Sequence, residues 1–152
     1  ETFTSLVDES CLTLEELMGE AVVDVRVGGE QILFRDELSS AMVHLSARGP
    51  VACAANGEHR YSWRLSATPS NAELIVVGPT VRLRLDEQVL TATGDAFWPV
   101  LIGVGERYAD RLSEALGPDH ELVQRFEKEL SPARRLRQKF LAGGQRSTAF
   151  ET

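Results

Sequence analysis

The stretch from Gly94 to Gly117 is the longest strongly periodic segment of the chain and most constrains what it can fold into. Its apolar residues recur at the i, i+3, i+4, i+7 spacing of a single helix face: Phe97, Leu101, Val104, Tyr108, Leu112 and Ala115. Asp95 is the expected N-cap, and Pro99 falls within or just past the first turn, where its missing N–H costs little. Because Gly117 and Pro118 then end the pattern, the stretch predicts one amphipathic helix lying over an apolar surface.

Alternating segments precede this helix and predict strands. Residues 21–27 place three valines on one face, and the Gly28-Gly29 turn returns the chain through 31–35, which indicates a hairpin. Further strands are expected over 73–77, 81–85 and 89–93. The half-exposed alternation favours an antiparallel sheet over a parallel one.

The dipeptide Asn56-Gly57 is the strongest hairpin signal in the chain. It predicts that residues 51–55 pair with 58–67 through a two-residue loop. In that register Cys53 lies opposite Arg60, and Ala52 and Ala54 leave room on one face for large neighbours: His59, Tyr61, Trp63 and Leu65.

Residues 36–48 change period, because Leu38, Ala41, Met42 and Leu45 form a helical stripe. Asp36 can cap this helix, and Gly49-Pro50 is expected to end it. A strand through 42–45 is the competing interpretation, since Val43 lies off the stripe. Near the N-terminus, the capping box Thr13–Glu16 predicts a short helix over 14–18. Residues 1–12 are expected to be a lead-in or an edge strand containing Phe3 and Leu6.

Two helices are expected after Pro118. The first is capped by Asp119 and buries Leu122, Phe126 and Leu130, and Glu121 can pair with Arg125 four residues on. The second begins at Ser131-Pro132, runs over 133–142 and buries Leu136 and Phe140. Residues 145–152 are expected to be disordered.

Together these segments predict one α+β domain over residues 1–144, strand-rich over 20–93 and helical over 95–142. The expected core is an antiparallel sheet of about five or six strands with the C-terminal helices packed on one face. A length of 152 residues, with 43% hydrophobic and 26% charged residues, fits one globular domain. No apolar run approaches the roughly 20 residues that cross a bilayer.

The net charge is −7, but it is unevenly distributed. Residues 131–152 hold five basic residues and one acidic residue, so the rest of the chain is strongly acidic. An acidic body argues against nucleic-acid binding over the main surface, because phosphate contacts need a positive footprint. Two cysteines do not indicate a disulfide framework, and we expect a bacterial, cytoplasmic protein.

The sequence contains no decisive catalytic motif. Its three histidines lack the close spacing of a zinc site, so no metal or cofactor is indicated. Cys53 opposite Arg60 is the one candidate nucleophile, since a guanidinium lowers a thiol pKa, but a small buried strand residue is the preferred interpretation. Gly103-Val104-Gly105 lies inside a helix, where it predicts a close helix–sheet contact instead of a nucleotide site.

We therefore expect a non-enzymatic protein–protein interaction module, such as a small bacterial immunity or inhibitor protein with an acidic surface. Its expected partner is a basic protein, contacted through Asp86, Glu87, Asp110 and Glu114. The sequence leaves homo-oligomerisation open.

Two other functions compete with this one. A small-molecule binder or enzyme would place its site between sheet and helix, lined by His59, Tyr61, Trp63, Trp98 and Tyr108. Alternatively, residues 131–152, with basic residues from 134 to 146, would form an arm that docks on nucleic acid or on a neighbouring subunit.

Overall fold

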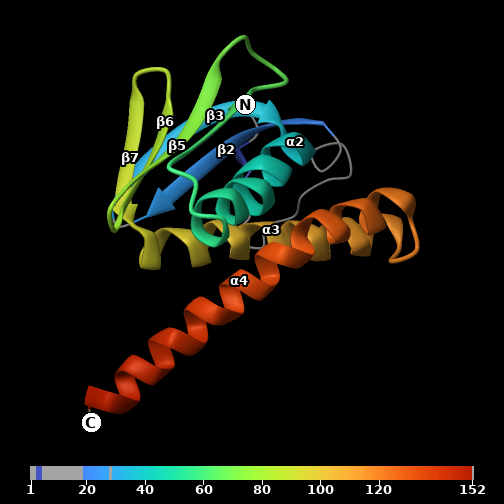
Figure 1. Ribbon diagram of the computed structural model, residues 1–152. Helices are drawn as coiled ribbons and strands as arrows, with labels where there is room; N and C mark the ends of the chain where they lie inside the picture. Colours follow the sequence, from blue (N-terminus) through green and yellow to red (C-terminus); the bar gives the residue numbers. More distant parts are fainter. Residues whose placement is uncertain (1–2, 5–18, 28, 152) are drawn as a thin grey trace.

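The computed structural model describes residues 3–4, 19–27 and 29–151, with side chains described over 19–27 and 29–142. It has the predicted α+β architecture, in which antiparallel strands are accompanied by C-terminal helices. The helices lie on one side of the strands, and the distal part of the last helix extends away from the body (Figure 1). The expected capping box and helix over 13–18 lie outside the described residues.

The first sheet has the order β1-β2-β3. Strands β2 (Glu20–Val27) and β3 (Glu30–Glu37) form the predicted hairpin, in which Val27 pairs with Glu30 and Gly29 turns the chain at a φ of 84°. The short strand β1 (Phe3–Thr4) pairs in parallel with β2, as an edge strand.

The second sheet is fully antiparallel, with strands in chain order. Its members are β4 (Arg60–Arg64), β5 (Asn71–Val77), β6 (Thr80–Leu85) and β7 (Gln88–Thr93). Three central leucines on its inner face, Leu74, Leu83 and Leu90, are fully or almost fully buried. The strands expected over 73–77, 81–85 and 89–93 are thus confirmed to within two residues.

Side chains, and not a backbone ladder, join the two sheets between β3 and β7. The Gln88 amide accepts a hydrogen bond from the Leu33 N–H at 2.9 Å and donates one to the Leu33 carbonyl at 2.7 Å. The Thr91 N–H donates to the Glu30 carboxylate at 2.9 Å. The Gln88 amide therefore makes the pair of hydrogen bonds that a backbone residue of a neighbouring strand would make, and it holds the two sheets edge to edge.

A helical segment connects the two sheets and corrects the hairpin expected around Asn56-Gly57. It runs through α2 (Leu38–Met42) and the π-helical segments η1 (Val43–Arg48) and η2 (Val51–Ala55). The prediction of a helix before Arg48 is confirmed, whereas the strand predicted over 51–55 is wrong. Gly57, at a φ of 72°, ends this helix, and the Glu58 N–H donates to the Ala52 carbonyl.

Gly49 does not stop the helix because the helix widens at this point. Its N–H donates to the His44 carbonyl five residues back, and a Cβ here would lie 2.5 Å from the Leu74 side chain. A Cβ would also lie 2.7 Å from the His44 carbonyl oxygen, so the glycine is needed for the widened helix and its packing on β5, and not for helix termination.

Asp36 is not the expected helix cap. It is fully buried at the end of β3, where one carboxylate oxygen accepts hydrogen bonds from the N–H groups of Ser66 and Ala67 at 2.7 and 3.1 Å. The helix instead begins after Glu37, and the Leu38 N–H donates to the Gly19 carbonyl. Asp36 thus ties the end of the first sheet to the loop after β4.

Helix α3 (Gly94–Leu116) is the predicted amphipathic helix, and it covers strands of both sheets. Its N-cap is Thr93, so Asp95 lies in the first turn instead of capping it. Gly117, at a φ of 92°, ends the helix as expected. Of the predicted inward face, Ala115 is exposed.

Gly105 brings α3 against η1, because a Cβ here would lie 2.5 Å from the Ser46 Cβ. The close contact expected at Gly103-Val104-Gly105 is therefore between helices and not between helix and sheet. At Gly103 a Cβ would meet only the Arg137 side chain, at an ordinary 3.5 Å.

Helix α4 (Glu121–Glu151) is continuous through Pro132, so the predicted break at Ser131 is wrong. The imidazole of His120, and not Asp119, accepts the hydrogen bond from the Leu122 N–H at its start. The predicted Glu121–Arg125 ion pair is confirmed at 2.7 Å. Residues 145–151 fall at the end of this helix, beyond the last described side chain. The expected disorder of 145–152 stays a prediction.

Candidate functional site

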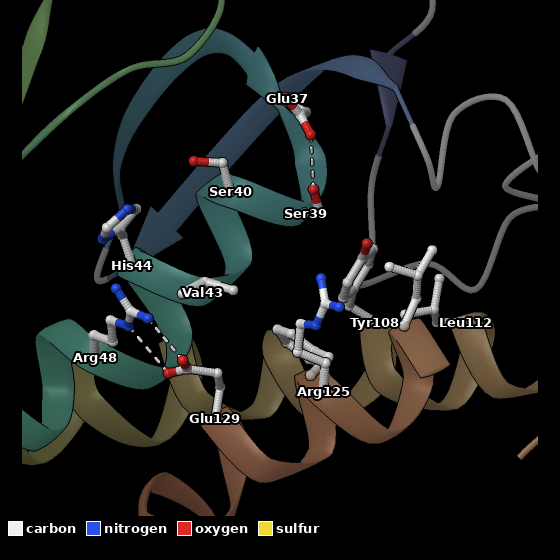
Figure 2. A pocket seen from close by; sticks show the side chains of 12 residues that line it. Glu37, Ser39, Ser40, Val43, His44, Arg48, Tyr108, Leu112, Arg125 and Glu129 are labelled. Carbon is white, nitrogen blue, oxygen red and sulfur yellow. Dashed lines mark hydrogen bonds and ion pairs between the residues drawn. The ribbon is translucent and has the colours of Figure 1, made fainter. Parts of the chain in front are cut away.

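A cavity of about 370 Å³ lies between η1, α3 and the start of α4 (Figure 2). Its apolar lining comes from three helices: Val43, Tyr108, Leu112, Leu122 and Phe126. The Tyr108 and Phe126 rings meet edge to face with centroids 5.0 Å apart, and burial raises the pKa of Tyr108 to about 12. This wall is therefore apolar and uncharged at neutral pH.

An ion pair closes one side of the cavity. The guanidinium of Arg48 on η1 donates two hydrogen bonds to the Glu129 carboxylate on α4, at 2.7 and 3.0 Å. These hydrogen bonds lower the pKa of Glu129 and raise that of Arg48. Glu129 is consequently an anion held in place, not a proton donor near neutral pH.

His44 lies between this cavity and an aromatic cluster on β4. Its Nδ1 is 2.7 Å from the Tyr61 hydroxyl, and its ring stacks on Trp63 at a centroid distance of 5.7 Å. Burial, and then the Arg48 charge, lowers the pKa of His44, although Asp36 and Glu129 oppose the shift. A neutral imidazole at pH 7 is therefore available for hydrogen bonding.

The cavity does not assemble a nucleophile with a base among the described residues. The Ser39 hydroxyl donates to the Glu37 carboxylate at 3.1 Å, and the Ser40 hydroxyl accepts from Ser66 at the same distance. Neither serine hydrogen-bonds to His44, which nucleophilic catalysis would need. The lining is suited to binding a small molecule with an apolar body and a few polar groups.

Cys53 does not face Arg60, because it lies in η2 instead of in a strand. Burial, followed by the negative charge of Glu58, raises its thiol pKa to about 11. The candidate nucleophile of the sequence is thus a buried, protonated thiol.

The five aromatic and histidine residues predicted to line one pocket lie in four places. Tyr61 and Trp63 are adjacent on β4, with ring centroids 5.7 Å apart, and Tyr108 lines the cavity. Trp98 is buried against Phe97, and His59 is exposed before β4. Their predicted role in ligand binding stays a prediction.

The sequence did not point to His44, Arg48 and Glu129. His44 and Arg48 are four residues apart and so share a helix side, which was a usable signal. Glu129 joins them only through the packing of α4, which no local pattern shows.

The four predicted acidic contacts are all exposed, but they lie on two elements. Asp86 and Glu87 form the β6–β7 turn, where Asp86 has a φ of 53° and accepts a hydrogen bond from Ser70. Asp110 and Glu114 lie on the C-terminal half of α3, and Glu114 pairs with Arg111 at 3.7 Å.

A second candidate surface is the outer face of the second sheet, which no described helix covers. We call it the arginine face, and define it by Arg60, Arg64, Arg82, Arg84, Glu73 and Ile75. The four arginines are exposed, and one glutamate is the only acidic residue on this face of β4–β7.

Among the residues that the structure describes, no group of three or more histidine, cysteine or acidic side chains is placed to hold a metal ion, and no helix is long and apolar enough to span a membrane. Comparison of the chain with protein-family models, curated proteins and solved structures gives no match.

Proposed function

We propose that the chain is a non-enzymatic protein–protein interaction module that acts in the cytoplasm. The observation that carries this proposal is the uncovered outer face of the second sheet. It presents Ile75, Val77 and Val89 among arginines, and Val77 and Val89 are 62% and 46% exposed. Arginine beside exposed aliphatic side chains is typical of interface surfaces.

A pull-down from an extract of the source cells at low salt tests this proposal. We expect the wild-type chain to retain a different protein, and Val89→Asp to retain less of it. Val100→Asp is the matched control, because Val100 is exposed to a similar extent on α3. Recovery of the chain alone, or equal losses in both variants, would count against the proposal.

The immunity or inhibitor role, with a basic partner, is the form of this function that the sequence favours. The exposure of its four acidic contacts supports it, although they do not share one element. Here Asp110→Lys with Glu114→Lys should abolish retention of a basic partner, and unchanged retention would argue against this role. The proteins recovered in the pull-down also test two further possibilities. They show whether the chain binds copies of itself, and whether the basic stretch 134–146 docks on another molecule.

A second candidate function, small-molecule binding, is supported by the cavity at His44. Its volume falls in the range of roughly 300 to 1,000 Å³ typical of ligand sites. A library of metabolites should include a compound that raises the Tm of the wild type but not that of Val43→Phe, in which the added ring occupies the cavity. Val77→Phe, on the outer face of the sheet, is the control. A compound that stabilises all three proteins equally would not use this cavity.

A further inference from the structure

The arginine face combines charge and spacing in a way that selects a kind of partner. In the strand register, Arg60 and Arg82 flank Ile75 across one row, and Ser62 and Arg84 flank Glu73 across the next. Strands lie about 4.8 Å apart, so the Cα atoms of Arg60 and Arg82 are separated by about 10 Å. All four guanidinium groups can therefore reach one extended segment.

The positive charge of this face is not neutralised within the described part of the chain. Glu73 contacts both Arg60 and Arg84, at 3.3 and 3.6 Å, and so divides one negative charge between two cations. Those arginine side chains remain 66% and 56% exposed. Neither Arg64 nor Arg82 has a carboxylate within ion-pair distance among the described side chains.

We propose that the arginine face binds an extended acidic segment of another protein. This inference rests on the interaction module proposed above, and it assigns to this face a partner chemistry different from the basic partner of the immunity role. Side chains two residues apart on an extended segment repeat at about 6.8 Å, as Arg82 and Arg84 do on β6. Carboxylates at alternate positions of the partner would meet these two arginines, and aliphatic side chains between them would contact Ile75 and Val77.

Charge and composition favour a polypeptide over nucleic acid. With a net charge of −7, the whole chain repels a polyphosphate, which carries a charge at every residue, more strongly than a segment with carboxylates only at alternate positions. The face also lacks aromatic side chains for base stacking, because Tyr61 and Trp63 point to the opposite side of β4. A second copy docked face to face would oppose arginine to arginine.

The test measures binding of the full chain to a 12-residue peptide in which Glu alternates with Thr, using isothermal titration calorimetry at low salt. The control peptide replaces each Glu by Gln. We expect binding of the acidic peptide only, and a loss of about tenfold or more in Arg82→Glu with Arg84→Glu. Lys128→Glu with Arg135→Glu is the matched control on α4, where both residues are exposed, and it should bind as the wild type does.

Arg82→Gln with Arg84→Gln provides a second, neutral variant, and circular dichroism verifies that each protein is folded. Equal binding of both peptides would overturn the proposal. So would an equal loss of peptide affinity in the sheet variant (Arg82→Glu with Arg84→Glu) and in the α4 variant (Lys128→Glu with Arg135→Glu). So would tighter binding of a 12-nucleotide thymidine oligomer, or self-association that Arg82→Glu with Arg84→Glu abolishes.

The cell-extract pull-down separates this inference from the function on which it rests. If the wild type retains a partner and the sheet variant retains the same amount, the interaction module stands and the arginine face is not its contact surface. If the wild type retains no partner, the proposed function itself fails, whatever the peptide does.

Discussion

The two faces of the second sheet are formed by alternate residues of the same strands, yet the inner face is buried and the outer face is exposed. Leu74 and Ile75 are neighbours on β5: Leu74 is fully buried beneath the helices, and Ile75 lies on the arginine face. Inside, the helix packs so closely on β5 that a Cβ at Gly49 would lie 2.5 Å from the Leu74 side chain. Outside, Glu73 is shared by two exposed arginines. The difference shows that the inner face determines stability and leaves the outer face available for recognition.

The largest expected effect comes from truncating the inner face. Leu74→Ala should lower the free energy of unfolding by about 3 kcal/mol, because it removes buried methyl groups and leaves a cavity. Ile75→Ala, one residue along the same strand, should cost less than about 1 kcal/mol. Urea denaturation of both variants measures the contrast, and equal losses would show that the two faces are not energetically distinct.

A smaller loss is expected when the spacing between helices is disturbed. Gly105→Ala should destabilise the fold by about 2 kcal/mol, since the new methyl group collides with the Ser46 Cβ. Gly103→Ala is the matched control and should be neutral or stabilise the fold by up to about 1 kcal/mol, through better helix propensity. Adding Ser46→Gly to Gly105→Ala should restore part of the loss in thermal denaturation; no recovery would place the strain elsewhere.

The stability of the fold should also depend on pH, through His44 on the inner side of the second sheet. Its pKa is lowered in the fold from the usual 6.5, so the unfolded chain binds the proton more readily. Stability should therefore be fully present above pH 6.5 and decline as the pH falls below it. His44→Gln should flatten the dependence of the free energy of unfolding on pH between 7.5 and 5.5. An unchanged slope would mean that His44 does not contribute to it.

The smallest effect on stability is expected on the outer face. Arg82→Glu with Arg84→Glu should change the Tm by no more than about 2 °C, because both side chains are exposed. The same variant is expected to lose binding of the acidic peptide. A large drop in Tm, measured by differential scanning calorimetry, would show that these arginines are structural and would remove the contrast between the faces.

Local patterns predicted the elements whose burial follows a single period. Val23, Val25 and Val27 are buried as the alternation indicates, and Leu101 and Leu112 lie inward on α3. These residues meet one continuous surface, so their own spacing is sufficient to place them.

Local sequence patterns gave wrong predictions where one pattern is compatible with two structures and tertiary packing decides between them. Asn56-Gly57 suits a hairpin turn and a helix end equally, because both place the glycine at positive φ. Gly49-Pro50 suggests a helix end and Ser131-Pro132 a helix start, but the chain stays helical through both. Likewise, the cavity depends on Glu129 reaching Arg48 from 81 residues away. The arginines of β4 and β6 were individually visible as alternating residues, but only the strand order unites them.

The bridge formed by Gln88 between β3 and β7 has a mechanical consequence. A continuous ladder distributes tension over many backbone pairs, whereas among the described residues the hydrogen bonds between the β3 and β7 edges come from the Gln88 amide and the Glu30 carboxylate. When force is applied across the strands, the hydrogen bonds between β3 and β7 should break before those within either sheet. The two sheets should then separate with each sheet intact.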